Sequence, residues 1–154
     1  MTITVSVPGR PRFELDHLLL DFTGTLSLDG ALLPGVAERL VALAGNLSVT
    51  VLTADTFGTA RQALAGLPVE LRLIATGADK LVFLETLGAD RVAAIGNGRN
   101  DVAMVSRAAL GIAVIGPEGA AGELVRVADV VATDICAALD LLLHPLRLTA
   151  TLRE

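Results

Sequence analysis

Short apolar runs and longer amphipathic stretches alternate along almost the whole chain. The runs are rich in Leu, Val, Ile and Ala, which is typical of strands buried on both faces of a sheet. Six such runs lie at residues 17–21, 47–52, 70–74, 91–95, 111–115 and 129–131. Segments with helical character lie at residues 33–46, 56–67, 77–89, 100–110, 119–128 and 134–143. In the second of these, Thr56 is expected to cap the helix.

This order of elements indicates a parallel sheet, because antiparallel hairpins have no room for a helix-length connection. We therefore predict an α/β fold, a three-layer α/β/α sandwich with a mainly parallel, Rossmann-like sheet and right-handed crossovers. Residues 1–154 are expected to form a single domain. Within it, residues 1–14 should form an added edge strand or an arm. Residues 144–154, which include Pro145, should form a loosely held tail.

Composition narrows the class of protein. Apolar residues make up 53% of the 154 residues and aromatic residues only 3%, so the interior must be built from aliphatic side chains. No apolar stretch approaches the roughly 20 residues that a membrane-spanning helix needs, and the N-terminus has no signal-peptide pattern. The net charge of −5 and the lack of basic clusters argue against nucleic acid as a partner. A cytoplasmic protein without membrane or nucleic-acid partners is expected.

Small, hydroxylic and charged residues follow the predicted strands. Since ligands of open α/β sheets bind beyond the carboxyl ends of the strands, these residues should converge on one edge of the sheet. The stretches that follow the first five strands are Asp21–Thr25, Thr53–Asp55, Thr76–Lys80, Gly96–Asp101 and Gly116–Gly119. That edge is the candidate site.

The residue types at this edge suit phosphoryl transfer. Asp21 could be a nucleophile that forms an aspartyl phosphate, although alone it could equally be a turn cap or a surface charge. A carboxylate that approaches a phosphate needs a cation, and Mg²⁺ shared with Asp101 would supply it. Thr53 and the N–H groups of residues 22–25 could donate to the phosphoryl oxygens. Lys80, near a helix start, would add positive charge.

These segments resemble the four signatures of the haloacid dehalogenase (HAD) superfamily of phosphohydrolases, and most of all the phosphorylation domain of P-type ATPases. DFTGTL is similar to the aspartyl-phosphate sequence Asp-Lys-Thr-Gly-Thr-Leu-Thr, and the other three are VLTADTFGTARQAL, GADKLVFLETL and AAIGNGRNDVAMVSRAALGIAV. The resemblance covers about residues 15–143. Residues 26–52 leave too little room for the ATPase nucleotide-binding domain, so the resemblance implies a free-standing protein without a cap domain.

The resemblance also implies roles, residue by residue. Its catalytic set is Asp21 as the nucleophile together with Thr23, Thr53 and Lys80. Its phosphate-binding set is Thr53, Ala54, Lys80, Gly24, Thr25 and Asn100. Its Mg²⁺ ligands are Asp21, the Thr23 carbonyl oxygen, Asn97 and Asp101.

Two positions depart from the family pattern. Thr23 stands where most HAD phosphatases have an aspartate that serves as general acid and base, and a hydroxyl cannot shuttle protons near neutral pH. Slow hydrolysis is therefore expected, since such assistance contributes about 10²–10⁴-fold. Asn97 stands where the family usually has a metal-binding aspartate. One negative charge is lost there, so the affinity for Mg²⁺ should fall.

The sequence leaves three functions open. The first is a Mg²⁺-dependent phosphatase that acts on a small phosphorylated substrate through an aspartyl phosphate on Asp21. The second is a catalytically degenerate HAD domain that binds a phosphate ligand or a partner protein. The third, a receiver-like phosphoacceptor, is disfavoured because only Glu14 and Asp16 could form its early acidic pair. Without a cap the site would be open, and a homo-oligomer could cover it.

Overall fold

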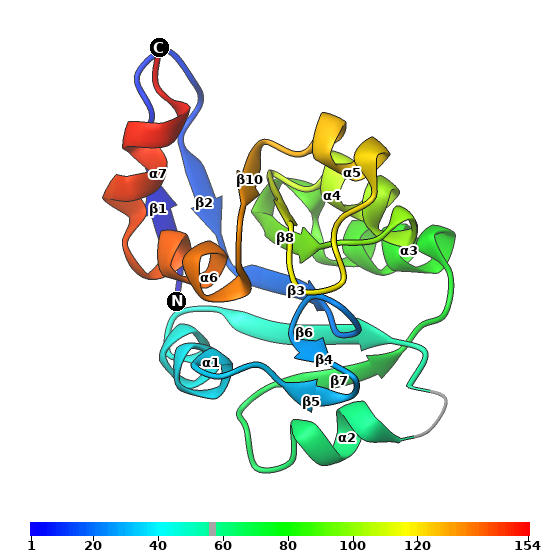
Figure 1. The fold of residues 1–154 in the computed structure, drawn as a ribbon. Coiled ribbons are helices and arrows are strands. Elements are labelled where there is room, and N and C mark those ends of the chain that lie inside the picture. The colour runs from blue at the N-terminus through cyan, green and yellow to red at the C-terminus, as the bar shows by residue number, and fades with distance from the viewer. Residues whose placement is uncertain (56–57) are drawn as a thin grey trace.

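The computed structural model describes residues 1–55 and 58–154, and a parallel sheet of six strands forms its centre (Figure 1). The strands are β3 (His17–Asp21), β6 (Ser48–Thr53), β7 (Glu70–Leu73), β8 (Val92–Gly96), β9 (Leu110–Val114) and β10 (Val130–Ala132). They lie in the order β10-β9-β8-β3-β6-β7, and every neighbouring pair is parallel. All six predicted strands are confirmed, with ends that shift by a single residue at most.

Helices cover both faces of this sheet, which confirms the three-layer sandwich. Buried side chains of α1 (Val36–Ala44), α2 (Thr59–Ala63) and α6 (Ile135–Leu143) belong to the core on one face. Those of α3 (Gly77–Leu87), α4 (Val102–Arg107) and α5 (Gly122–Val127) belong to the core on the other. Two 3₁₀ turns, η1 (Ala89–Arg91) and η2 (Arg99–Asp101), precede β8 and α4. The cap expected at Thr56 lies outside the described residues.

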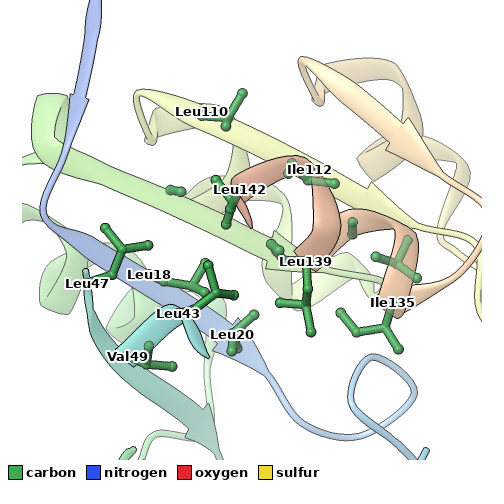
Figure 2. Close-up of a cluster of buried hydrophobic side chains, with 14 of the residues drawn as sticks. Leu18, Leu20, Leu43, Leu47, Val49, Leu110, Ile112, Ile135, Leu139 and Leu142 are labelled. Atoms are coloured by element: carbon green, nitrogen blue, oxygen red, sulfur yellow. The ribbon is translucent and has the colours of Figure 1, made fainter. Parts of the chain in front are cut away.

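The central strand β3 is buried on both faces. Successive side chains of a strand point to opposite sides of the sheet, and Leu18 and Leu20 accordingly lie in one core cluster while Leu19 lies in the other. Figure 2 shows Leu18 and Leu20 packed among leucines and isoleucines from β9, α1 and α6. Because aliphatic packing fixes β3 from both sides, the position of Asp21 at its carboxyl end is fixed as well.

Between β3 and β6 the chain forms only a small hairpin and α1, so no cap domain is inserted there. The hairpin pairs β4 (Ser27–Leu28) with β5 (Ala31–Leu32). Asp29 and Gly30 form its two-residue turn with φ of 51° and 84°. Both values lie in the left-handed region that such hairpin turns require. The expected capless architecture is therefore confirmed.

The N-terminal residues form an arm rather than an edge strand of the main sheet. β1 (Ile3–Val5) and β2 (Phe13–Leu15) pair antiparallel in a sheet of their own. Arg91, the last residue of η1, anchors the end of this arm through ion pairs of 2.8 Å with Glu14 in β2 and with Asp16 just after it. Of the two alternatives that the sequence left open, the structure therefore has the arm.

The prediction of a loose C-terminal tail is wrong. Residues Pro145–Leu152 form α7, which packs against β1 (Figure 1) and buries Leu148 and Leu152. Thr149 also donates a hydrogen bond of 2.8 Å to the carbonyl of Ser6. Proline has a φ suited to the first helical turn and needs no N–H partner there, so Pro145 begins a helix.

No helix in the described part of the chain is by itself long and apolar enough to cross a membrane. Helices α6 and α7 reach the required length and apolar content only as a pair. They meet at a bend of 103°.

We predict that Leu148→Ala lowers the free energy of unfolding by about 2–5 kcal/mol, because it opens a cavity in the contact between α7 and the arm. Leu146→Ala, two positions away on the same helix, is the matched control. Its side chain is 83% exposed, so the change should stay within about 0.5 kcal/mol. Urea unfolding followed by circular dichroism measures both. Equal effects of the two variants would contradict the docked position of α7.

Candidate functional site

Asp21 lies at the point where the sheet reverses its winding. The chain proceeds from β3 to β6 and β7 on one side, and then returns to β8, β9 and β10 on the other. Such a switch point leaves a crevice outside the carboxyl ends of the strands, where ligands of open α/β sheets bind. Asp21 is the last residue of β3, and its side chain is almost entirely buried.

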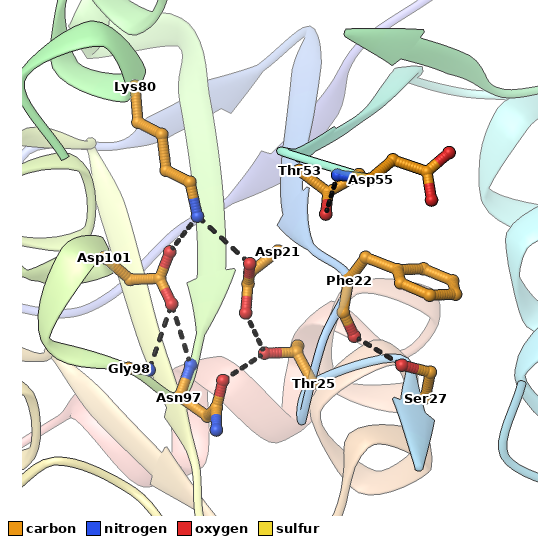
Figure 3. Close-up of polar contacts among 10 residues, drawn as sticks. All are labelled: Asp21, Phe22, Thr25, Ser27, Thr53, Asp55, Lys80, Asn97, Gly98 and Asp101. Carbon is orange, nitrogen blue, oxygen red and sulfur yellow. Dashed lines mark hydrogen bonds and ion pairs between the residues drawn. The ribbon is translucent and has the colours of Figure 1, made fainter. Parts of the chain in front are cut away.

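Lys80 joins Asp21 to Asp101 (Figure 3). Its Nζ lies 3.0 Å from Oδ1 of Asp21 and 2.7 Å from Oδ1 of Asp101, and its side chain is only 1% exposed. Helix α3 begins just before it, where the Thr76 hydroxyl accepts a 3.1 Å hydrogen bond from the Asp79 N–H. This start places Lys80 in the first turn of α3, where it points into the sheet edge. One ammonium thus serves two carboxylates.

Asp101 is completely buried and holds the loop that follows β8. Its Oδ2 accepts hydrogen bonds from the N–H groups of Asn97 at 3.1 Å and Gly98 at 3.0 Å, while its Oδ1 accepts from Lys80. A side chain at Gly96 would overlap the Asp101 carboxylate, so this position needs a glycine. Asp101 therefore joins the site as an anchor behind Lys80 and Asn97, with both of its oxygens engaged.

The loop after β3 contacts the loop after β8 through Gly24 and Thr25. The Thr25 hydroxyl lies 3.0 Å from Oδ2 of Asp21 and 3.0 Å from Oδ1 of Asn97. Gly24 has φ of 75°, and a Cβ there would lie 2.6 Å from Nδ2 of Asn97 and 3.2 Å from Oε2 of Glu118. Only glycine combines that backbone conformation with this close approach.

A cavity of about 240 Å³ opens between these loops. Its lining residues are Asp21, Thr23, Thr53, Ala54, Ile74, Ala75, Lys80, Asn97, Gly98 and Asn100. Seven of the ten predicted site residues are among them, and the other three, Gly24, Thr25 and Asp101, lie next to lining residues. Ile74 and Ala75 were not predicted as site residues, since apolar side chains at a strand end carry no chemical signal. Glu118 had no predicted role either.

The loop after β6 forms a wall of this cavity. Thr53 is buried, and its hydroxyl accepts a hydrogen bond of 3.3 Å from the N–H of Asp55. The Asp55 carboxylate accepts from the N–H groups of Ala60 at 2.7 Å and Arg61 at 3.2 Å, which fixes the start of α2. A second cavity, of about 370 Å³, shares Thr23, Thr53 and Ala54 with the first.

The buried charges shift one another's pKa values. Burial and the nearby Asp101 carboxylate raise the pKa of Asp21 from 3.8 to about 6, although Lys80 and Thr25 oppose this shift. Burial alone would lower the pKa of Lys80, but the two carboxylates outweigh it and raise that pKa. At neutral pH the group therefore carries two negative charges and one positive. A bound cation would relieve this imbalance.

Three residues that line the cavity carry oxygen donors of the kind that Mg²⁺ prefers. Asp21 has a carboxylate, Thr23 a backbone carbonyl and Asn97 an amide oxygen. Mg²⁺ prefers such hard oxygen ligands, with the remaining positions filled by water and substrate. In residues 1–55 and 58–154, no group of three or more His, Cys, Asp or Glu side chains could hold a metal ion. The arrangement thus suits a Mg²⁺ ion held mainly with water and phosphate, and not a structural zinc.

Comparisons with known proteins agree with this geometry. The family model of haloacid dehalogenase-like hydrolases matches residues 63–135. The uncharacterised protein MJ0073 of Methanocaldococcus jannaschii is 47% identical over 79 residues, which are 49% of this chain and 85% of that protein. The chain therefore belongs to the haloacid dehalogenase-like hydrolases.

Two solved structures share the fold at low sequence identity. The 3-deoxy-D-manno-octulosonate 8-phosphate phosphatase of Moraxella catarrhalis, in complex with magnesium and phosphate ions, aligns with a TM-score of 0.69 at 18% identity over 88% of this chain and 90% of its own. The catalytic domain of the CPx-ATPase CopB aligns with a TM-score of 0.61 at 24% identity over 72% of this chain and 45% of its own. The fold is thus common to a phosphatase and to the catalytic domain of a CPx-ATPase.

We predict that Asp21→Asn stabilises the metal-free protein at pH 7.5 by about 1–3 kcal/mol. The pKa of Asp21 is higher in the folded state than its ordinary 3.8, so stability falls as pH rises between about 4 and 6, and the full cost is present above pH 6. The gain should therefore shrink at pH 4.5. Urea unfolding in EDTA at both pH values measures it.

The control for this prediction is Asp29→Asn, at the exposed turn of the β4–β5 hairpin, where asparagine tolerates the left-handed backbone. It should leave stability nearly unchanged at both pH values. A clear loss of stability in Asp21→Asn at pH 7.5 would show that the Lys80 ion pair outweighs the cost of burying the carboxylate.

Proposed function

We propose that this chain is a Mg²⁺-dependent phosphatase that transfers the phosphoryl group of a small substrate to Asp21. One observation carries the proposal, namely that the ammonium of Lys80 lies between Asp21 and Asp101 at an open cavity. A structural lysine in the first turn of a helix would be solvated. Here it is buried where it neutralises a nucleophile and an incoming phosphate.

In the first half of the reaction, the Asp21 carboxylate attacks phosphorus and an Asp21 O–P bond forms while the bond to the leaving oxygen breaks. Lys80 and the Thr53 hydroxyl hold the phosphoryl oxygens, together with N–H groups of the loops at Gly24 and Ala54. When bound, Mg²⁺ supplies the positive charge that lets the two anions approach. The Thr25 hydroxyl keeps the carboxylate oriented.

In the second half, water attacks the phosphorus of the aspartyl phosphate. The Asp21 O–P bond breaks, inorganic phosphate leaves and the carboxylate is restored. Thr23 occupies the place from which a general acid and base would serve both halves, and its hydroxyl neither releases nor takes up a proton near pH 7. The leaving group must therefore take its proton from water, which makes turnover slow.

The adjoining cavity suggests the type of leaving group. Its lining residues are Phe22, Thr23, Asp29, Gly30, Thr53, Ala54, Asp55 and Thr59. Its volume of about 370 Å³ is at the small end of ligand pockets. Its described lining residues include two aspartates and no basic side chain, so a small neutral or cationic leaving group fits better than a second anion.

One feature favours a second candidate, a degenerate domain that binds phosphate without turnover. Nδ2 of Asn97 donates a 3.2 Å hydrogen bond to the carbonyl of Gly119. The Asn97 amide thus holds the Gly119 loop, which an aspartate could not do. This is expected of a domain that keeps its loop structure but has lost a negatively charged metal ligand. Turnover measurements separate the two candidates.

We predict Mg²⁺-dependent release of p-nitrophenol from p-nitrophenyl phosphate, with activity lost in EDTA and in Asp21→Asn. Acid quenching of the wild type in the presence of acetyl phosphate should trap an acyl phosphate on Asp21. Phosphate binding by calorimetry without release in any condition would instead support the degenerate domain. A stable adduct without release would support a phosphoacceptor.

We further predict that Thr23→Asp raises the rate of hydrolysis of an alkyl phosphate. The increase should approach about 10²–10⁴-fold, which is the contribution of general acid–base catalysis. Thr23 is exposed at the cavity, so a carboxyl group there costs little on folding. Steady-state kcat with glycerol phosphate measures the effect, and Thr23→Ser is the control that should leave kcat unchanged. Equal rates in the two variants would show that proton transfer does not limit turnover.

A further inference from the structure

The loop between β9 and α5 lies against the loop that follows β3. Gly116 and Gly119 pair with each other, with a hydrogen bond of 2.9 Å from the Gly119 N–H to the Gly116 carbonyl, so Pro117 and Glu118 form the tip of a tight turn. A Cβ on Gly116 would lie 3.2 Å from the Gly24 carbonyl oxygen. Figure 1 shows this segment, in yellow, passing the end of β3.

The same loop brings a carboxylate to Gly24. Oε2 of Glu118 lies 3.2 Å from the position that a Cβ of Gly24 would take, beside the side chain of Asn97. Gly24 shares its peptide bond with the Thr23 carbonyl, which is one of the oxygens that suit Mg²⁺. Glu118 is exposed and forms no ion pair in the described part of the chain. Its charge is therefore not neutralised by a neighbouring side chain.

Asn97 holds this loop in place. Its Nδ2 donates to the Gly119 carbonyl at 3.2 Å, and its own carbonyl accepts from the Ala121 N–H at 2.8 Å. An aspartate at position 97 would present only acceptors to the Gly119 carbonyl and would repel it. Asn97 therefore has two effects. It lacks the negative charge that an aspartate would bring to the cavity, and it holds in place the loop that carries the Glu118 carboxylate.

We propose that Glu118 returns to the Mg²⁺ site the negative charge that Asn97 lacks. This inference rests on the proposed function, because it assigns a residue to the ion of that same site. The carboxylate lies beside Gly24, next to the residues that line the cavity, and from there it attracts the ion through space or through a coordinated water. A charge at this range and in this partly solvated setting changes the affinity for a divalent ion by about three- to tenfold.

The test is the Mg²⁺ dissociation constant of the metal-free protein, measured by isothermal titration calorimetry at fixed ionic strength so that screening stays constant. Glu118→Gln should weaken binding about three- to tenfold, and Glu118→Asp should recover most of the loss. Glu123→Gln is the matched control. It removes an equal charge a few residues on, from an exposed glutamate that pairs with Arg99 at 3.4 Å, and should leave Mg²⁺ binding within twofold.

Thermal midpoints in EDTA check that each variant folds. A Glu118→Gln dissociation constant within twofold of the wild type overturns the inference, as does an equal loss in Glu123→Gln, which would show only an effect of net charge. If Mg²⁺ binding is unchanged while p-nitrophenyl phosphate is still hydrolysed, the inference falls and the proposed phosphatase stands. If the wild type binds no Mg²⁺ at millimolar concentration, both fall together.

Discussion

One buried ammonium between two buried carboxylates is the interaction on which the rest of this structure depends. The Lys80 side chain enters from α3, Asp21 ends the central strand β3 and Asp101 closes the loop after β8. Removing the Lys80 charge from such a dry setting would leave two buried carboxylates that repel each other, which costs far more than the loss of a surface ion pair. The triad therefore ties three elements together and leaves the site with an excess of negative charge.

The excess negative charge at the site affects both the stability of the fold and the ligands that the site can bind. A fold selected for stability alone would neutralise Asp21, whereas here burial and Asp101 raise its pKa to about 6. The site is consequently left with an excess negative charge that a bound divalent cation would neutralise. The aliphatic packing of Leu18, Leu19 and Leu20 on both faces of β3 offsets the cost of holding a charge at that strand's end.

The sequence predicted the sheet well because its signal is local. Runs such as Leu18–Leu20 are continuous and aliphatic, which only strands covered on both faces explain, and the intervening helical segments force parallel pairing. The loose tail was wrongly predicted because Pro145 stops one helix and equally suits the start of another. Only the packing of α7 against β1, with Leu148 buried, decides between these outcomes. Likewise, nothing local separated an arm from an edge strand at residues 1–14.

The sequence identified the residues of the site but not how deeply they are buried. Lys80 in a first helical turn is normally solvated, and its burial became visible only when Asp21 and Asp101 were brought to it from distant segments. The sequence predicts Asp101 as a Mg²⁺ ligand but gives no sign that its oxygens also accept hydrogen bonds from Lys80 and from two backbone N–H groups. Asn97 also holds the 116–119 loop through a hydrogen bond to Gly119. These two residues are 22 positions apart, and no sequence motif indicates that they are in contact.

The Thr25 hydroxyl has a single hydrogen and faces two acceptors at equal distance, Oδ2 of Asp21 and Oδ1 of Asn97. At any instant it can donate fully to only one of them. The hydroxyl therefore turns toward whichever oxygen is the better acceptor. If Asp21 were phosphorylated as proposed, its acyl phosphate would be the poorer acceptor and the hydroxyl would turn toward the Asn97 amide. The loop after β8 would then register a covalent change at the end of β3 through one hydroxyl rotation.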